Sequence, residues 1–183
     1  MMEKTIVITI AAGKNRAQVL GLFDRDIKLV RTMPNTPALV GEGMTAVCPT
    51  ENLSSSEVES VLSLLGAYGK TELLEERLFD GYTAMCGSSP AYVYMFIEAL
   101  ADGGVREGLP RDKAYRMAAQ AVLGSAKMVL ETGIHPGQLK DQVCSPGGST
   151  IEAVGVLEDK GFRSAVMEAL RVCARKSGQL SES

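Results

Sequence analysis

The spacing of hydrophobic residues along this chain changes at about residue 78. Ahead of that point, short apolar runs alternate with segments that contain glycine, proline and serine. Residues 5–10 are β-branched and almost continuously apolar, which is typical of a strand buried in a parallel sheet. Further strands are expected over residues 28–33, 44–48 and 71–74, and the first two of these end at prolines.

Two helices are expected between these strands. Residues 17–23 carry a short helical pattern. Residues 58–65 carry a longer one, which the Ser-Ser-Ser-Glu run at 54–57 can cap and which Gly66 and Gly69 end. Strands separated by short helical crossovers indicate an α/β fold for this part of the chain.

Beyond residue 78 the pattern predicts helices and no strands. Helices are expected over residues 90–105, 110–131, 136–143, 149–160 and 162–176. Several of them begin with proline in the first turn, where its missing N–H costs nothing. The predicted fold class is therefore α/β followed by all-α.

The helix expected over residues 110–131 has a wide apolar face built mostly from small side chains. Such a face lets a second helix approach closely. That neighbour is either a helix of the same subunit, as in an ordinary core, or a helix of a partner subunit. The residues of this face are Ala114, Met117, Ala118, Ala121, Val122, Ser125, Met128 and Val129.

The composition is that of a globular cytoplasmic protein. Of 183 residues, 45% are hydrophobic and 22% charged, which suffices for a core. The net charge is -3 and the basic residues are scattered, which argues against a nucleic-acid partner. The longest apolar run, residues 91–97, is far short of the ~20 residues that span a bilayer, so no membrane association is expected. Early charges also argue against a secretion signal.

Neither cysteine nor histidine spacing points to a metal site. Cys48, Cys86, Cys144 and Cys173 are far apart, and reduced thiols are favoured over disulfides or metal ligation. His135 is the only histidine and precedes a proline. A role at a loop or helix start is favoured for it over general-base catalysis.

The most informative stretch is the Ser-Pro-Gly-Gly corner at residues 145–148, which separates two expected helices. Its glycines allow backbone conformations that a Cβ would forbid. Ser149 and Thr150 add hydroxyls where the first N–H groups of the next helix lack internal partners. A small carboxylate would fit there, at the positive end of the helix dipole, although a Gly-Gly N-cap without a ligand is commoner.

Five motifs follow one another along the chain. They are Ile-Ala-Ala-Gly at 10–13, Arg-Thr-Met-Pro-Asn-Thr-Pro-Ala at 31–38, Gly-Ser-Ser-Pro-Ala-Tyr at 87–92, Glu-Ala-Leu-Ala-Asp-Gly-Gly-Val at 98–105, and His-Pro-Gly-Gln-Leu-Lys-Asp at 135–141. In this order they resemble pyrroline-5-carboxylate reductase, from residue 6 to residue 175. The resemblance implies hydride transfer from NADPH, or NADH, to the cyclic imine 1-pyrroline-5-carboxylate, giving L-proline. It also implies a homodimer or a higher homo-oligomer.

The resemblance implies a domain plan as well. Residues 1–76 would be the C-terminal part of a Rossmann-like nucleotide-binding domain, and 77–183 a helical dimerisation and substrate-binding domain. Family members begin with a βαβαβ half that carries the glycine-rich fingerprint for the cofactor pyrophosphate. That half is expected to be missing, which leaves a truncated sheet. Residues 41–46 spell G-x-G-x-x-A, but a strand is expected after them rather than a helix, so we interpret the match as a decoy.

By resemblance, the loop of Ile10, Ala11 and Ala12 borders the nicotinamide and ribose of the cofactor, beyond the carboxyl end of the first strand. Asn35 follows the next strand, so it would also lie beyond the carboxyl end of a strand and border the cofactor. Alternatively, it caps the turn in Pro-Asn-Thr-Pro. Gln142 stands where the family has a polar amide side chain that reaches the cofactor.

By resemblance, the corner and the helix start after it hold the substrate carboxylate through the Ser145 hydroxyl and backbone N–H groups. The N–H groups are those of Gly148, Ser149 and Thr150. The Thr150 hydroxyl, the candidate catalytic group, would lie near the ring nitrogen as it becomes an amine. Glu76 corresponds to a position near bound proline, or it is a solvated charge. A protonated imine is already electrophilic, so positioning and water exclusion would supply most of the catalysis.

Three hypotheses are open at this point. The chain is a reductase whose nucleotide-binding half has been lost from this sequence or is supplied separately, a non-catalytic homologue that acts as a dimerisation module, or a reductase of another imine or keto acid. Three departures bear on them, because Ser89 stands where the family usually has glycine, Cys86 where serine is common and Tyr82 where a smaller residue is usual. A positive φ at residue 89 would strain the serine.

Overall fold

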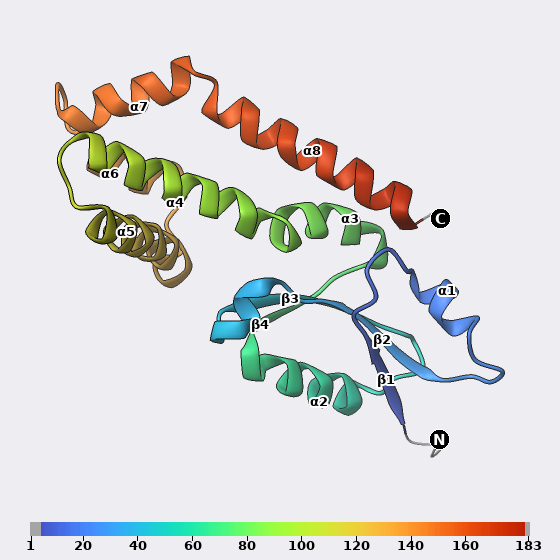
Figure 1. The fold of residues 1–183 in the computed structure, drawn as a ribbon. Coiled ribbons are helices and arrows are strands. Elements are labelled where there is room, and N and C mark those ends of the chain that lie inside the picture. Colours follow the sequence, from blue (N-terminus) through green and yellow to red (C-terminus); the bar gives the residue numbers. More distant parts are fainter. Residues whose placement is uncertain (1–4, 182–183) are drawn as a thin grey trace. The chain divides into compact units, whose positions relative to one another are not determined.

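The computed structural model describes residues 5–181 (Figure 1). Compactness divides the chain into two units, and each is described by itself. Unit 1 holds the described residues up to Pro90 and those from Glu168 onward, and unit 2 holds Ala91–Met167. The functional boundary expected between residues 76 and 77 is a separate matter and stays a prediction.

The helices and strands follow the expected order. The strands are β1 (Ile6–Thr9), β2 (Lys28–Met33), β3 (Gly43–Pro49) and β4 (Gly69–Leu73). The helices are α1 (Arg16–Leu20), α2 (Ser55–Leu65), α3 (Phe79–Tyr82), α4 (Ser89–Arg106), α5 (Arg111–Thr132), α6 (Pro136–Val143), α7 (Ser149–Asp159) and α8 (Phe162–Ser181). Short 3-10 turns occupy Thr36–Val40, Gly66–Tyr68 and Glu76–Leu78, and a π turn occupies Thr83–Gly87.

The strands of unit 1 form one mixed sheet in the order β1-β2-β3-β4. β1 pairs with β2 and β3 with β4 in parallel, whereas β2 and β3 are antiparallel. All four expected strands are confirmed, but short helical crossovers do not connect all of them. Only residues 34–42 join β2 to β3, fewer than the dozen or so that a parallel crossover needs, so the chain turns back.

Helices cover both faces of the sheet. Helix α2 covers one face (Figure 1), where its Val61 and Leu65 pack on Val30 and Val47. Phe79 and Tyr82 of α3 pack on the opposite face. The burial expected for the first strand is wrong, because β1 is an edge strand and its residues are only half-buried.

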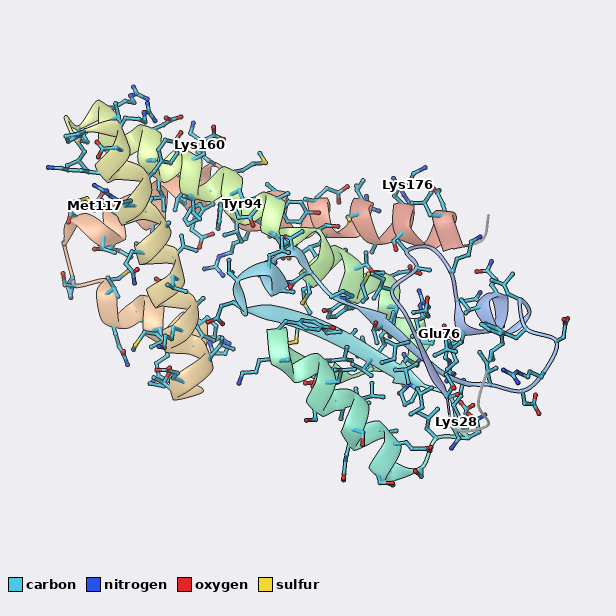
Figure 2. All side chains as sticks on the ribbon, turned by 60° about the horizontal axis from the view of Figure 1, so that its bottom comes forward. Lys28, Glu76, Tyr94, Met117, Lys160 and Lys176 are labelled. Carbon is cyan, nitrogen blue, oxygen red and sulfur yellow. The ribbon has the colours of Figure 1, made fainter. Side chains whose placement is uncertain are left out.

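The cap expected for the second helix is confirmed. Ser54 is the N-cap of α2, where its side chain accepts from the Glu57 N–H while the Glu57 carboxylate accepts from the Ser54 N–H. Gly66 ends the helix. Glu57 also forms an ion pair with Lys28 of β2, which is labelled in Figure 2, with 2.5 Å between Nζ and Oε1. The ion pair joins the helix start to the sheet. This capping box therefore also fixes where α2 meets the sheet.

A helical segment between Glu76 and Gly87 was not expected from the sequence. Tertiary contacts hold it. The Tyr82 hydroxyl donates to the Met44 carbonyl at 2.6 Å, and the Ser177 hydroxyl donates to Asp80 at 2.8 Å. Phe79 is fully buried against the sheet. Burial and these contacts outweigh the weak helix propensity of the Asp-Gly pair at residues 80 and 81.

The interpretation of residues 41–46 as a decoy is confirmed by the backbone. Gly41 ends a 3-10 turn with φ 77°, and Gly43 opens strand β3 rather than a helix. Gly43 faces Gly69 in the parallel pair of β3 and β4. A Cβ on Gly43 would lie 2.9 Å from the Tyr68 carbonyl oxygen, so this glycine permits close approach of two strands.

Unit 2 is helical, and its buried core is small. Ala101 of α4 and Ala114 and Ala118 of α5 form the buried cluster. Other members of the expected apolar face stay accessible, with Met117 56% and Met128 50% exposed. Among residues 5–181 no residue other than glycine has a positive φ, so the strain considered for Ser89 is absent.

Candidate functional site

The loop after β1 lies at the edge of the sheet where ligands of α/β proteins bind. β1 and β2 are parallel, so their carboxyl ends share this edge. Ile10 is 64% exposed, and Ala11 and Ala12 are exposed as well. The Ala11 N–H donates to the Thr9 hydroxyl at 3.2 Å, which turns the chain away from the strand. The three residues expected to border the cofactor therefore form one accessible surface.

Gly13, the last residue of this motif, needs to be glycine for two reasons. Its φ is 70°, and a Cβ there would stand 3.2 Å from the Leu180 carbonyl oxygen of α8. Next to it, unit 1 contains a cavity of about 190 Å³. The cavity is lined by Ala12, Gly13, Arg31, Met33, Thr83, Ser88, Cys173, Lys176, Ser177 and Leu180.

Asn35 fixes the segment after β2 with both ends of its amide. Its Oδ1 accepts from the Met44 N–H at 3.0 Å and its Nδ2 donates to the Cys86 carbonyl at 3.1 Å. It is the N-cap of the 3-10 turn at Thr36–Val40 but makes no side-chain cap hydrogen bond there. The Asn35 side chain therefore joins β3 to the π turn.

Glu76, which is labelled in Figure 2, accepts hydrogen bonds from two arginines of unit 1. Its Oε1 accepts from the Arg16 backbone N–H at 2.7 Å and from Arg31 Nη1 at 2.9 Å, and its Oε2 accepts from Arg16 Nε at 3.2 Å. Only 25% of its side chain is exposed. The alternative of a solvated charge is therefore wrong for Glu76. Its exposed neighbours Glu75 and Arg77 pair with each other instead.

The electrostatics of this cluster follow from the hydrogen bonds. Burial alone would raise the pKa of the Glu76 carboxyl, but the hydrogen bonds from Arg16 and Arg31 outweigh it and hold the pKa below its ordinary value. The Arg31 side chain is 6% exposed, and its guanidinium lies 4.4 Å over the Phe79 ring. Cys48 lies nearby, and burial raises the pKa of its thiol, so it stays neutral.

The Ser-Pro-Gly-Gly corner is a tight turn in unit 2. Gly147 has φ 66°, and the Gly148 N–H donates to the Ser145 carbonyl at 3.0 Å. The Ser145 hydroxyl lies over Gly148, in space that a Cβ would need. Gly148 is then the N-cap of α7, without a side-chain cap hydrogen bond. Capping by the hydroxyls of Ser149 and Thr150 is therefore not what starts this helix.

The start of α7 leaves donors available. The first N–H groups of a helix have no acceptor within it, and here these belong to Ser149, Thr150 and the residue after them. Because the Gly148 N–H already bonds within the turn, Ser149 and Thr150 are the better anion donors. Thr150 is half-buried and Ser149 is exposed. The sequence did not show that the turn occupies one of the three expected N–H groups.

Gln142 and His135 lie on α6 and at its start. Gln142 is exposed and lines a cavity of about 380 Å³ in unit 2. The cavity is bounded by Ser125, Met128, Val129, Pro136, Leu139, Lys140, Gln142 and Val143. His135 is the N-cap of α6, and its Nδ1 accepts from the Gly137 N–H at 3.1 Å. The helix-start role favoured for this histidine is confirmed.

The described part of the chain has no grouping of side chains that could hold a metal ion. Its four cysteines, Cys48, Cys86, Cys144 and Cys173, are free thiols. Within the same residues, no helix combines the length and the apolar character needed to cross a membrane.

Comparison with protein-family models gives one match that covers more than half of the chain. The model for pyrroline-5-carboxylate reductase dimerisation matches residues 76–180. It therefore begins at Glu76 and includes the corner, Thr150 and Gln142.

Comparison with curated proteins extends the similarity to nearly the whole chain. The pyrroline-5-carboxylate reductase of Escherichia coli (strain K12) is 54% identical over 181 residues, which are 99% of this chain and 67% of that protein. The Synechocystis enzyme of the same name is 45% identical over 180 residues, 98% of this chain and 67% of that protein. The chain thus spans about two thirds of the length of these relatives.

Two solved structures are similar to this chain over nearly its whole length. A pyrroline-5-carboxylate reductase from Coxiella burnetii has a TM-score of 0.93 at 32% identity, covering 99% of this chain and 68% of that one. Plasmodium falciparum pyrroline carboxylate reductase, solved with NADP bound, has a TM-score of 0.88 at 36% identity, covering 96% of this chain and 71% of that one.

Proposed function

Since this chain belongs to the pyrroline-5-carboxylate reductase family, we propose that it reduces 1-pyrroline-5-carboxylate to L-proline with NADPH or NADH. The observation that carries the proposal is the corner at residues 145–148. It places a hydroxyl and free helix N–H groups together, as a small carboxylate requires. No acid–base set or metal is needed for reduction of an iminium ion, which is consistent with the side chains present.

In this proposal the corner binds and orients the substrate. The N–H groups of Ser149 and Thr150, with the Ser145 hydroxyl, hold the carboxylate at the positive end of α7. The Thr150 hydroxyl hydrogen-bonds the ring nitrogen as it changes from iminium to amine. The Gly148 N–H contributes to the turn rather than to the ligand, because it bonds to the Ser145 carbonyl. Positioning would supply most of the rate enhancement.

The cofactor would supply a hydride from its dihydronicotinamide ring. The accessible loop of Ile10, Ala11 and Ala12 fits its nicotinamide end, because the loop lies beyond the carboxyl ends of two parallel strands. Asn35 would act at the same edge by fixing the segment after β2, and Gln142 would contribute a polar amide. The described residues contain no glycine-rich turn that opens a helix after a strand, so the pyrophosphate end has no proposed partner among them.

A second candidate is a dimerisation module without activity of its own. The match of the dimerisation model and the accessible apolar side chains of α5 favour it. Both candidates share a homodimer or a higher homo-oligomer, and they differ only in whether this chain binds cofactor. An oxidoreductase of the cytoplasm remains the proposal for the active form.

The experiment that separates the two is calorimetric titration of the purified chain with NADPH and then NADH, with proline present. If this chain is the active form, the preferred cofactor binds saturably with a micromolar Kd and 1-pyrroline-5-carboxylate is reduced in a steady-state assay, which would show that residues of this chain also hold the pyrophosphate end. Absence of heat up to millimolar cofactor would reject the reductase proposal for this chain and leave the dimerisation module.

A further inference from the structure

Glu76 ties three separate segments of unit 1 to one carboxylate. Arg16 opens α1 directly after the exposed loop, Arg31 lies in β2, and Glu76 itself begins the 3-10 turn that leads into α3. Three of the hydrogen bonds on this carboxylate come from the two arginines, at 2.7, 2.9 and 3.2 Å. One side chain thus links the end of the loop, the sheet and the helical segment.

The loop between Thr9 and Asn15 has few restraints of its own. Its Ala11 N–H bonds to Thr9, two residues away, and its surface is exposed. Apart from the close approach of Gly13 to Leu180 of α8, its two ends therefore define its conformation. The pairing of β1 with β2 holds the first end, and Asn15 and Arg16 hold the second.

Arg16 is held more firmly than a surface residue. Beyond its two bonds to Glu76, its Nη1 donates to the Pro49 carbonyl at 2.6 Å, at the end of β3. Its side chain is 22% exposed. The two bonds from Arg16 to Glu76, one from its backbone N–H and one from its side chain, together fix the main chain at the point where the loop becomes α1.

The same geometry argues against contact between Glu76 and the substrate. The carboxylate is three-quarters buried and serves two guanidinium groups. Glu76 also neutralises the buried Arg31, whose Nε has no hydrogen-bond partner among the described atoms.

We propose that Glu76 is a positioning residue, which acts through Arg16 to hold the loop of Ile10, Ala11 and Ala12 in the conformation that receives the nicotinamide end of the cofactor. The identity of that ligand rests on the proposed function. The hydrogen-bonded link between Glu76 and the loop does not rest on the proposed function, because it is inferred from the hydrogen bonds alone.

The test compares Glu76→Gln and Arg16→Gln with a matched control, Glu75→Gln. Glu75 is the adjacent residue, is exposed and pairs only with Arg77 in the observed ion pairs of this stretch. Hydrogen–deuterium exchange of peptides covering residues 10–20 reports on the loop, with β3 peptides as an internal reference. Calorimetry with NADPH and with proline reports on the two ligands separately.

We expect both test variants to exchange at least tenfold faster in the loop, with β3 unchanged, and to raise the Kd for NADPH at least tenfold while the Kd for proline stays the same. Glu75→Gln should change none of these. Unchanged loop exchange would overturn the proposal. A raised Kd for proline with an unaltered Kd for NADPH would also overturn it, because Glu76 would then contribute to substrate binding.

Two complications are resolved within the same experiment. Glu76→Gln could leave the charge of Arg31 uncompensated and loosen the whole sheet, in which case β3 peptides would exchange faster too. Arg16→Gln keeps the Arg31–Glu76 pair, so its loop exchange then decides whether Glu76 acts on the loop through Arg16. If the unaltered chain binds no NADPH, the proposed function fails. Loop exchange in the variants still supports or overturns the positioning of the loop by Glu76.

Discussion

The hydroxyl of Ser145 lies in the space that a Cβ at Gly148 would occupy. The Ser145 carbonyl oxygen would lie 3.1 Å from the same Cβ. The corner can therefore close only because residue 148 is glycine, and its closure is what brings a serine hydroxyl to the start of α7.

Gly148→Ala should weaken substrate binding by opening this corner. The Ser145 hydroxyl would have to move, and loss of one charge-assisted hydrogen bond of about 1.5–3 kcal/mol corresponds to a roughly ten- to 150-fold rise in the Kd for proline. Gly155→Ala is the control, because nothing lies within 4 Å of its Cβ position in α7. It should leave proline binding unchanged and stabilise the helix by about 0.5–1 kcal/mol. Equal proline affinities for the two variants would disprove the role of the corner.

Thr150→Ala should lower kcat without a comparable change in fold. If the hydroxyl bonds the nitrogen more tightly in the transition state, its loss costs about 1–3 kcal/mol, a roughly five- to 150-fold decrease in kcat. Thr150→Ser should restore most of the rate, and Ser149→Ala should leave kcat nearly unaltered. A Thr150→Ala enzyme with the parental rate would remove this residue from the mechanism.

Tyr82→Phe should destabilise unit 1. The hydroxyl is buried and donates to the Met44 carbonyl at 2.6 Å, and its removal leaves a buried acceptor without that donor, at about 1–3 kcal/mol. Burial also raises the pKa of the Tyr82 hydroxyl, so the bond persists at alkaline pH. Urea denaturation followed by far-ultraviolet circular dichroism measures the loss. Tyr94→Phe, at a position 59% exposed, is the control and should have no effect.

Glu57 should make the stability of the α2 cap pH-dependent in acid. The hydrogen bond from Lys28, followed by those from Ser54, lowers the pKa of Glu57 from 4.5 to about 2. Since the folded pKa is the lower one, this stabilisation is complete above pH 4.5 and is lost as the pH falls through about 2. Denaturation midpoints measured across this range should fall less steeply for Glu57→Gln than for the parent. Glu59→Gln, on the exposed side of α2, is the control, and its denaturation midpoint should fall as steeply as that of the parent. If the midpoint of Glu57→Gln also fell as steeply, the pH dependence would not come from Glu57.

The chain should be a dimer or larger in solution through its helical part. α5 presents Met117 and Met128 at about half of their full exposure, next to a cavity that Met128 itself lines. Multi-angle light scattering should give at least twice the monomer mass. Met128→Lys should shift the equilibrium toward monomer, whereas Gln120→Lys, at helical spacing from the charged residues Arg116 and Lys127 of α5, should not. A parental chain that is a stable monomer at micromolar concentration would contradict both candidate functions.

Periodicity was sufficient to predict strands and long helices, because each of them has an apolar pattern of its own. The capping box at Ser54 and the helix start at His135 were readable for the same reason, since the local side chains make the bonds. The helical segment at Phe79 was not readable. Its residues fold through contacts with Met44 and Ser177, which are remote in sequence.

The direction of β3 could have been predicted, because the connection from β2 is too short for a crossover. The Glu76 cluster could not, since nothing in a Glu-Glu-Arg run distinguishes the residue that faces Arg16 and Arg31 from its solvent-exposed neighbour. For the corner, the glycines and hydroxyls indicated an anion site, but only coordinates show that the Gly148 N–H is consumed within the turn. The assignment of individual residues to cofactor or substrate stays a prediction.

Unit 1 is assembled from both ends of the described chain, with the last part of α8 packed where Gly13 meets Leu180 and Asp80 meets Ser177. During synthesis on the ribosome, the sheet therefore emerges long before the helix that completes its surroundings. All of unit 2 is made in the interval. Contacts of such large sequence separation form slowly, because the intervening chain must be closed into a loop first. Until α8 is made, the loop at Gly13 and the segment at Asp80 lack their partners, so unit 1 is complete only once the last residues of that helix have been synthesised.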